Sequence, residues 1–318
     1  MSNFYGQYIG YGSGGGPAAE LYQAEFFIYA QGGQQSGNQA YDRIDRWSVN
    51  ADTNATDVGN LTQISMYNCG ASSGTDGFCC TSAAAYPSVT GIQKYSYAAA
   101  TTNASAHGDV VTANSGSHGH SDMSAQFGYK NGGHGANINK QRFAFAANVT
   151  ATNVGNLSTH HHQGGGSQDL THGYSVSGYN QPENGDVSQI DRFAFASTVD
   201  SVDCGDVTVG RGGIDNAVSS TTKGYLVGGY SIGGGGYTNI IDSHTYASTI
   251  TAADIGDLAV ATQGNGAAGA TEYGYAFGGQ PPATMNHIWK FSFASGTQNG
   301  ADIADLTLAR VYVSGTQH

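Results

Sequence analysis

Histidine is the residue type in this sequence with the clearest capacity for metal or proton chemistry, and its positions cluster. His118 and His120 flank a glycine, while His160, His161 and His162 are consecutive. Converging imidazoles bind zinc or nickel. However, no acidic residue or cysteine recurs beside these histidines. The pattern therefore favours a hydrated polar lining, with no cofactor and no metal needed for folding. These five histidines are the candidates if a metal is bound.

Acidic residues recur in two patterns, and both favour a structural role. A Gly-Asp/Asn-Leu/Val sequence, such as Gly205-Asp206-Val207, resembles a calcium-binding loop, but it lacks the acids at alternate positions that such a loop needs. We expect a turn whose acid accepts backbone N–H bonds. Asp45 and Asp191 each precede an arginine at the start of an aromatic strand. Because neighbours on a strand point to opposite faces, we expect each charge to reach an adjacent structural unit.

The four cysteines, Cys69, Cys79, Cys80 and Cys204, have no CxxC spacing of the kind that binds metal. Cys79 and Cys80 are adjacent in an expected strand, so their side chains point to opposite faces. Buried free thiols are the favoured interpretation, because free cysteine behaves as a small apolar residue. A Cys69–Cys79 or Cys69–Cys80 bridge between adjacent strands is the alternative.

These residues lie in a sequence that repeats six times, and the repeat must position them. An anchor residue, aromatic in type, recurs every 47 to 51 residues. The anchors are Trp47, Tyr95, Phe143, Phe193, His244 and Phe291. A second position follows each anchor by 12 or 13 residues, and it is occupied by Gly59, Gly108, Gly155, Gly205, Gly256 and Ala304. A fixed period of about 40–50 residues, with several short strands in each repeat, indicates an all-β propeller with one blade per repeat, here six-bladed.

Upstream of each anchor is an aromatic-apolar strand, which ends in a pair of glycines in four repeats. The pairs are Gly32-Gly33, Gly132-Gly133, Gly228-Gly229 and Gly278-Gly279. Only glycine turns sharply with positive φ and also lets a neighbouring backbone approach closely. On these motifs, residues 25–318 resemble the kelch repeat, whose blades carry a diglycine that closes the second strand and an aromatic residue in a later one. The second repeat departs from this pattern, because Cys79-Cys80 stands there without a diglycine.

Each blade is expected to contain an inner strand, the aromatic-glycine strand, the anchor strand and a short outer strand. In the second blade the inner strand is expected to begin near 64–67. Both histidine clusters are expected at the start of inner strands, beside the central channel. The loops at 54–57 and 101–104 are expected to be Asx-type turns, in which a short polar side chain caps the backbone.

The two ends of the repeat region predict how the ring closes. Residues 307–315 form an inner strand with no blade after it, while the first blade starts at its second strand, within 25–33. The C-terminal strand is therefore expected to complete the N-terminal blade, which removes open sheet edges. Residues 25–318 are predicted to be a single propeller domain, preceded by a Gly/Tyr-rich arm at 1–24.

Signatures of known propeller enzymes do not occur in the sequence. The S-x-D-x-G-x-T-W turn of sialidase-type propellers and the H-E-x-x-H zinc motif are both absent. No set of tyrosine, histidine and cysteine residues matches the ligands of kelch-fold copper oxidases. The sequence therefore predicts a protein that is not an enzyme.

The charge of the chain argues against nucleic acid and membrane partners. It has 11 Lys and Arg against 23 Asp and Glu, for a formal net charge of −12. No basic stripe is present, so duplex nucleic acid is not expected. No run of about 18 apolar residues occurs, so no membrane insertion is expected. The N-terminus lacks the basic and apolar regions of a secretory signal. We therefore expect synthesis in the cytoplasm, and an extracellular location only after release by another route, such as release within a particle.

The repeats are similar to those of kelch-like proteins of tailed bacteriophages, particularly marine ones, whose blades carry phrases like those at 190–196 and 54–62. The resemblance implies a virion structural or attachment protein on a tail fibre, spike or capsid surface. It also implies an oligomer that contacts other virion proteins and binds a host-surface glycan or protein through loops on one face. A subunit of a bacterial extracellular filament or surface lattice is a second hypothesis, and a carbohydrate-active enzyme is a third. Fold alone does not decide among them.

We expect residues 1–16 to contact another chain in the assembled particle or filament, with Tyr5, Tyr8 and Tyr11 as anchors. These aromatic residues belong to no repeat, and an interface gains about 25 cal/mol for each Å² of apolar surface that it buries. Deletion of residues 2–16 should therefore abolish assembly, measured by light scattering, without lowering the melting temperature of the propeller. The alternative is that the arm folds back over its own propeller and caps the channel mouth or a blade edge. Assembly of the deleted protein at the wild-type level would mean that the arm is not the connector and that the contacts lie on the propeller body.

Overall fold

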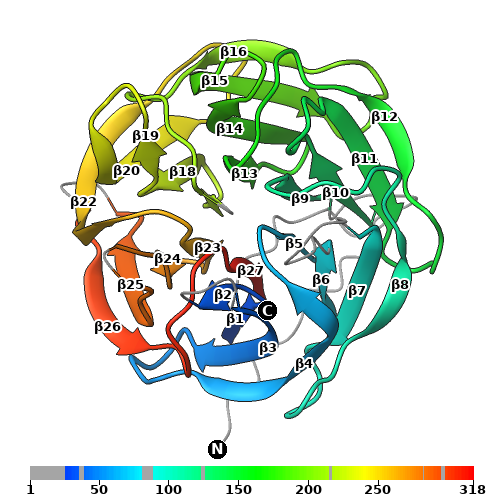
Figure 1. Cartoon of the computed structure of the whole chain (residues 1–318), viewed down its shortest axis with the longest axis vertical. Coiled ribbons are helices and arrows are strands. Elements are labelled where there is room, and N and C mark those ends of the chain that lie inside the picture. Colours follow the sequence, from blue (N-terminus) through cyan, green and yellow to red (C-terminus); the bar gives the residue numbers. More distant parts are fainter. Residues whose placement is uncertain are drawn as a thin grey trace, which may run out of the picture.

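The computed structural model describes residues 26–35, 39–80, 89–122, 126–214, 217–281, 283–294 and 298–318. The arm at 1–24, with Tyr5, Tyr8 and Tyr11, lies outside the described residues. Six sheets surround a central axis (Figure 1), so the predicted all-β six-bladed propeller is confirmed. None of the described residues belongs to a helix with the length and apolarity needed to cross a membrane.

Each blade has four main strands, counted outward from the axis as first to fourth. Blade 1 contains β27 (Ser314–Gln317), β1 (Phe27–Gln31), β3 (Gln39–Ser48) and β4 (Thr56–Ser65). Blade 2 contains β5 (Cys69–Ser72), β6 (Asp76–Cys80), β7 (Gly91–Ser96) and β8 (Ser105–Asp109). Blade 3 contains β9 (His118–Asp122), β10 (Phe127–Asn131), β11 (Asn139–Ala144) and β12 (Thr152–Asn156).

The second half of the ring repeats this order. Blade 4 contains β13 (Gly165–Gln168), β14 (His172–Asn180), β15 (Gly185–Ala194) and β16 (Val202–Asp206). Blade 5 contains β17 (Val218–Ser219), β18 (Lys223–Val227), β20 (Gly236–Thr245) and β22 (Ala253–Thr262). Blade 6 contains β23 (Gly266–Gly269), β24 (Tyr273–Phe277), β25 (His287–Ser292) and β26 (Ala301–Asp305). Three two-residue strands join these sheets at their margins: β2 (Gln34–Gln35), β19 (Tyr230–Ser231) and β21 (Ile250–Thr251).

The C-terminal strand completes the N-terminal blade, as predicted. β27 pairs antiparallel with β1, from Ile28 opposite Gln317 to Gln31 opposite Ser314, and Figure 1 shows the two strands side by side near the axis. The strand is shorter and later than the expected 307–315. Residues 307–313 are instead the connection from the rim of blade 6 to the axis.

The inner strand of blade 2 was also expected too early. β4 continues through Ser65, and the first strand of blade 2 begins only at Cys69. Ile64, expected near the start of an inner strand, has half of its surface exposed. The reason is the same at both places, because the chain must cross a blade from rim to axis before a first strand can start.

Every anchor residue packs across a blade junction on an aromatic ring from the second strand of the preceding blade. The six pairs, with ring centroids 5.4 to 6.3 Å apart, are Tyr29–Tyr95, Phe78–Phe143, Tyr129–Phe193, Tyr174–His244, Tyr225–Phe291 and Tyr275–Trp47. No anchor is more than 3% exposed. Such a pair adds about 0.5–1.5 kcal/mol beyond its buried area, so the ring of blades gains from all six.

The glycine that follows five of the anchors, and Ala304 at the same place in blade 6, lies inside the fourth strand and not in a turn, so the predicted turn is wrong. At Gly205, φ is +143° and an added Cβ would lie 1.9 Å from the carbonyl oxygen of Ile250 in the next blade. The pairing of third and fourth strands shifts register here. The backbone N–H of Gly205 is accepted by Asp203 Oδ1, two residues before the glycine, at 3.0 Å, whereas Asp206 of the predicted motif accepts the Ser188 hydroxyl at 2.6 Å. The motif is a β-bulge at the point where the neighbouring blade's loop crosses the strand.

The asparagines of the two loops expected to be Asx turns cap the neighbouring blade, while Asp57 of the first loop also caps its own backbone, since its Oδ1 accepts the Gly59 N–H at 3.2 Å. Asn103 Oδ1 of blade 2 accepts the Asn60 N–H of blade 1 at 2.9 Å. Asn54 Oδ1 of blade 1 accepts the Asp305 N–H of blade 6 at 3.1 Å. Equivalent bonds join Asp200 to Asn156 and Asn299 to Asp257. The polar loop residues therefore hold adjacent blades together.

The aspartates of the third strands reach the connection that arrives from the preceding blade, as predicted for Asp45 and Asp191. Asp45 accepts hydrogen bonds from the N–H (3.0 Å) and hydroxyl (2.6 Å) of Thr307, and Asp191 does the same with Ser158. Asp45 also forms a buried ion pair with Arg310 at 2.8 Å. A second such pair joins Asp242 to Arg211 at 2.7 Å. The sequence had not singled out either arginine.

Replacement of Arg310 by methionine should destabilise the propeller strongly. The change leaves the Asp45 carboxylate buried without its cation, and removal of one partner from a buried ion pair costs about 3–5 kcal/mol. The double variant Asp45→Asn/Arg310→Met removes both charges and should recover most of that loss. Urea denaturation followed by circular dichroism measures both free energies of unfolding. Equal losses in the single and double variants would contradict the role of the ion pair.

Candidate functional site

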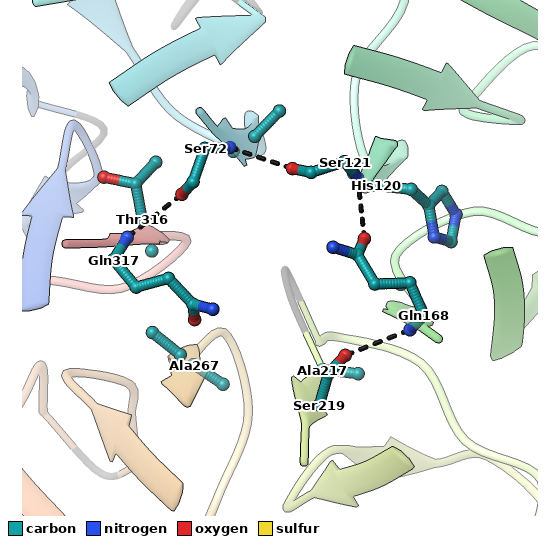
Figure 2. Close-up of a pocket in the computed structure, with 15 residues that line it drawn as sticks. Ser72, His120, Ser121, Gln168, Ala217, Ser219, Ala267, Thr316 and Gln317 are labelled. Atoms are coloured by element: carbon teal, nitrogen blue, oxygen red, sulfur yellow. Dashed lines mark hydrogen bonds between the residues drawn. The ribbon is translucent and has the colours of Figure 1, made fainter. Parts of the chain in front are cut away.

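The first strands of the blades line a narrow channel on the propeller axis (Figure 2). Four of them carry glycine at the point of closest approach: Gly70, Gly119, Gly166 and Gly315. An added Cβ on Gly119 would lie 2.1 Å from the carbonyl oxygen of Gly70, so a larger residue has no room there. The cavity between the strands has a volume of about 50 Å³. Since one water fills about 30 Å³ of the liquid, the channel holds only a few waters and excludes a sugar.

A ring of hydrogen bonds runs around this channel from blade to blade. At five junctions a backbone N–H donates to a side-chain oxygen of the next blade. The accepting side chains, at 2.6 to 3.0 Å, are Ser121, Gln168, Ser219, Gln317 and Ser72. Figure 2 shows four of these bonds. At the sixth junction the equivalent residue of blade 6 is Gly269, which has no side chain to accept. The hydroxyl and amide groups of the channel thus hold the first strands of neighbouring blades together.

Of the five candidate histidines, only His120 lines the channel. Its Nδ1 donates to the Ser167 carbonyl oxygen and its Nε2 accepts from the Ser175 hydroxyl, each at 3.2 Å. His160, His161 and His162 do not start an inner strand, contrary to expectation. They lie in the connection from β12 to β13, and β13 begins at Gly165.

His118 and His161 form a buried pair between blades 3 and 4, with ring centroids 5.8 Å apart. Neither ring nitrogen of His118 has a hydrogen-bond partner among the described residues. His161 Nε2 lies 3.9 Å from Asp191 Oδ2, which is too far for a direct hydrogen bond. Burial lowers the pKa of both histidines, so both are neutral at physiological pH. Within the described part of the chain, no three His, Cys, Asp or Glu side chains are placed to share a metal ion. The expectation that folding needs no metal stays a prediction.

The other two histidines belong to an open cleft, which we take as the candidate site. It lies on the face that carries the connections between second and third strands, and its volume is about 200 Å³. Its lining comes from three blades and consists of His134, His162, Tyr179, Asn180, Gln181, Asn184, Gly185 and Ile232. His160 supports it from below, since its Nδ1 accepts the Gln181 N–H at 3.1 Å and its Nε2 donates to the Gly133 carbonyl at 3.0 Å.

Three rings form one wall of this cleft. The ring of His162 is perpendicular to that of His134 at 5.6 Å and lies 5.5 Å from that of Tyr179. Burial, together with the neighbouring His160 and His134, lowers the pKa of His162 to about 4. His162 Nδ1 donates to the Tyr179 carbonyl oxygen at 3.0 Å, which leaves Nε2 as a neutral acceptor. The His162 ring in this aromatic wall is therefore neutral at neutral pH.

Amide side chains form the rest of the polar lining. Asn180 is 9% exposed, and its Oδ1 has no hydrogen-bond partner in the described structure. Gln181 joins two blades, because its Oε1 accepts the Gly135 N–H at 2.8 Å and its Nε2 donates to His134 at 3.2 Å. A buried amide oxygen without a partner is costly, so Asn180 is a group that a ligand would satisfy.

The sequence analysis missed most of this cleft. His134, Tyr179, Asn180 and Gln181 were not singled out. The available signal was in blade 4, where Ser177-Gly178 replaces the diglycine and β14 continues to Asn180. That extension forms the long hairpin on which three of these four residues stand.

Two Gly-x-Ser-x-Gly sequences, at 70–74 and 229–233, also escaped the sequence analysis. This sequence is typical of hydrolase nucleophile elbows, where it joins a strand to a helix. Here Ser72 ends the strand β5, where its Oγ accepts the Gln317 N–H at 3.0 Å. Ser231 donates to Asp186 at 2.9 Å. Neither arrangement provides the helix of an elbow.

A second hollow, of about 490 Å³, lies on the opposite face between blades 5 and 6. Its lining includes Thr222, Glu272, Tyr273 and Phe293. None of its described lining residues has a buried polar atom without a partner. The cleft of blade 4 is thus the better candidate for ligand binding.

Comparison with known proteins supports the fold and does not extend to function. No protein-family model matches the chain, and no curated protein sequence matches it. Among solved structures it is similar to one titled "Structure of YjhT", with a TM-score of 0.63 and 11% identity over 80% of this chain and 88% of that one. The similarity spans most of both chains, so the kelch-like six-bladed propeller is shown by structure as well as by repeat.

The neutral buried histidines should make the propeller less stable in acid. Burial lowers the pKa of His120 to about 3 and that of His244 to about 4, whereas an unfolded histidine has a pKa of about 6.5. Below pH 6.5 the unfolded chain takes up protons that the folded chain does not. The free energy of unfolding should therefore fall as pH drops from about 6.5 toward 4, by up to about 1.4 kcal/mol per pH unit for each such histidine.

The variant His244→Phe isolates one of these contributions, since the same anchor position is phenylalanine in three other blades. We expect urea denaturation at several pH values to show that the free energy of unfolding of this variant falls less steeply as pH drops. The difference in slope should correspond to one fewer proton taken up on unfolding. Loss of the bond between His244 and the Ser167 hydroxyl would lower stability at every pH without changing the slope. An unchanged slope would mean that His244 is already protonated in the folded chain.

Proposed function

We propose that this chain is a non-enzymatic binding propeller, a structural or attachment subunit of a virion that presents the cleft of blade 4 to a host-surface glycan. The observation that carries the proposal is the cleft itself, with its aromatic wall beside Asn180 and Gln181, in which the His162 ring is neutral. The virion setting rests on the resemblance of the repeats to phage kelch-like proteins.

The composition of the cleft suits a sugar. A pyranose has a face of C–H groups that packs on aromatic rings such as Tyr179 and His162, and a rim of hydroxyls that both donate and accept. Asn180 Oδ1 and His162 Nε2 are acceptors that such hydroxyls would satisfy. The volume of about 200 Å³ is below the roughly 300–1,000 Å³ of sites for drug-sized ligands, which favours a single sugar residue at the end of a glycan.

Binding is favoured over turnover by the residues present. Glycoside hydrolysis ordinarily uses a pair of carboxylates, whereas the described lining of the cleft contains imidazole, phenol and amide groups and no carboxylate. A bacterial filament subunit remains a second candidate for the setting of the protein, since the Gly/Tyr-rich arm suits polymerisation equally well.

A glycan array with labelled protein tests the proposal. The wild-type propeller should bind a defined set of glycans, and His162→Ala or Asn180→Ala should weaken that binding at least tenfold, which corresponds to about 1.4 kcal/mol. His172→Ala is the matched control, because His172 stands at the opposite end of the same strand β14 and should leave binding unchanged.

The alternative functions give different results. Binding that survives both cleft variants would place the glycan site elsewhere on the propeller, and release of free sugar from a bound glycan would identify an enzyme. The absence of any bound glycan on the array would overturn the proposed function.

A further inference from the structure

Cys69 and Cys80 face each other across the first two strands of blade 2. They are directly opposite in the antiparallel pairing of β5 and β6, so their side chains lie on the same face. Both are 1% exposed and both are free thiols, as predicted. The two side chains belong to one buried cluster, and each thiol affects the pKa of the other as a hydrogen-bond partner.

The other two cysteines are excluded from this pair by the fold. Cys79 is opposite Gly70 and points to the other face of the sheet, where it packs with Tyr29 and Tyr95 toward blade 1. Cys69 and Cys80 instead pack together toward blade 3. Cys204 stands in blade 4, on β16. The predicted opposite orientation of Cys79 and Cys80 is therefore confirmed, and a Cys69–Cys79 bridge does not fit.

A buried cation lies near the pair. Lys130 of β10 is 1% exposed, and its ammonium group donates to the Ser117 hydroxyl at 2.7 Å and to Asn114 Oδ1. The hydrogen bond from Cys80, and then the charge of Lys130, lower the pKa of Cys69. The same shared proton raises the pKa of Cys80. A cysteine whose pKa is lowered, beside a thiol that keeps its proton, is an arrangement from which a disulfide can form once the first loses its proton.

We propose that Cys69 and Cys80 are an oxidation site, and that they form a reversible disulfide between β5 and β6 when exposed to a small peroxide. Residues directly opposite in an antiparallel pair have Cα atoms about 4.5–5.5 Å apart, within the range of about 4.4–6.8 Å found for disulfides. The bridge needs no change of register. It joins the channel-lining strand of blade 2 covalently to its neighbour.

The reaction balances with hydrogen peroxide as oxidant. The Cys69 thiolate attacks one peroxide oxygen, the O–O bond breaks, and hydroxide leaves as a sulfenic acid forms on Cys69. The Cys80 sulfur then attacks the Cys69 sulfur, the S–O bond breaks, and water leaves. In sum, two thiols lose two hydrogen atoms and the peroxide is reduced to two waters. The proposal does not depend on the glycan-binding function. If the chain is carried out of a reducing cytoplasm, the bridge would form after release.

Thiol counting on the folded protein tests this proposal. The variant Cys79→Ala/Cys204→Ala keeps only the proposed pair. After treatment with hydrogen peroxide, removal of peroxide, unfolding and alkylation, it should take up no alkyl group, and after dithiothreitol it should take up two. Wild-type protein should retain two alkylated residues, Cys79 and Cys204, and a digest should contain the peptides of Cys69 and Cys80 joined. The melting temperature should rise on oxidation and return with dithiothreitol.

Several outcomes would overturn the proposal. These are two alkylatable thiols in the oxidised double variant, a sulfinic acid on Cys69 in place of the bridge, or a bridge that involves Cys79, Cys204 or a second chain. The same rate of bridging in urea would show that closeness in sequence, and not the fold, brings the thiols together. If the double variant does not fold, peptide mapping of the wild-type protein gives the same test.

Discussion

The packing of an aromatic ring across each blade junction is the interaction on which the rest of the structure depends. Each anchor ring meets a ring from the preceding blade, and the six contacts close into a circle. The ring of the anchor also lies over its own sheet, where a glycine faces it in five blades. An added Cβ on Gly128 would meet the Phe143 ring at 2.2 Å. The glycines thus leave the space that the large anchor rings fill. This explains why a chain with 49 glycines still has a hydrophobic core.

The charged and amide side chains discussed above form ion pairs and hydrogen bonds mainly between blades. Asp45 and Asp242 hold the incoming connections and pair with Arg310 and Arg211 in the interior. Asn103 and its counterparts cap the strand of the neighbouring blade, and the channel side chains bond around the axis. A buried polar group is costly unless it is paired, so each of these contacts also favours one angle between two sheets. The low charge of the chain is consistent with a rigid ring whose polar groups are used internally.

Both proposed sites occur where a blade departs from the repeat. Blade 4 replaces its diglycine and extends β14 to Asn180, which raises a hairpin beside His134 and His162. Blade 2 has Cys80 where blades 1 and 3 have Gln31 and Asn131, and Cys69 opposite it. Local departures from an otherwise consistent pattern are expected at functional positions, because the packing of anchor rings against glycines does not require them.

The sequence by itself determined the period, the number of blades and the closure by the C-terminal strand. These follow from the fixed spacing of the repeated residues and from the incomplete repeats at 25–33 and 307–315, and they do not require the contacts between blades to be known. Only the tertiary structure decided where first strands begin, that Asn103 caps another blade, and that His162 meets His134 and Tyr179. The pairing of Cys69 with Cys80 depended on both sequence and structure. The sequence allowed two pairings, Cys69–Cys79 and Cys69–Cys80, and the strand register selected the second. The physical reason is that contacts between blades depend on the register and angle of neighbouring sheets. Those quantities are set by the packing of the whole ring, and no single repeat encodes them.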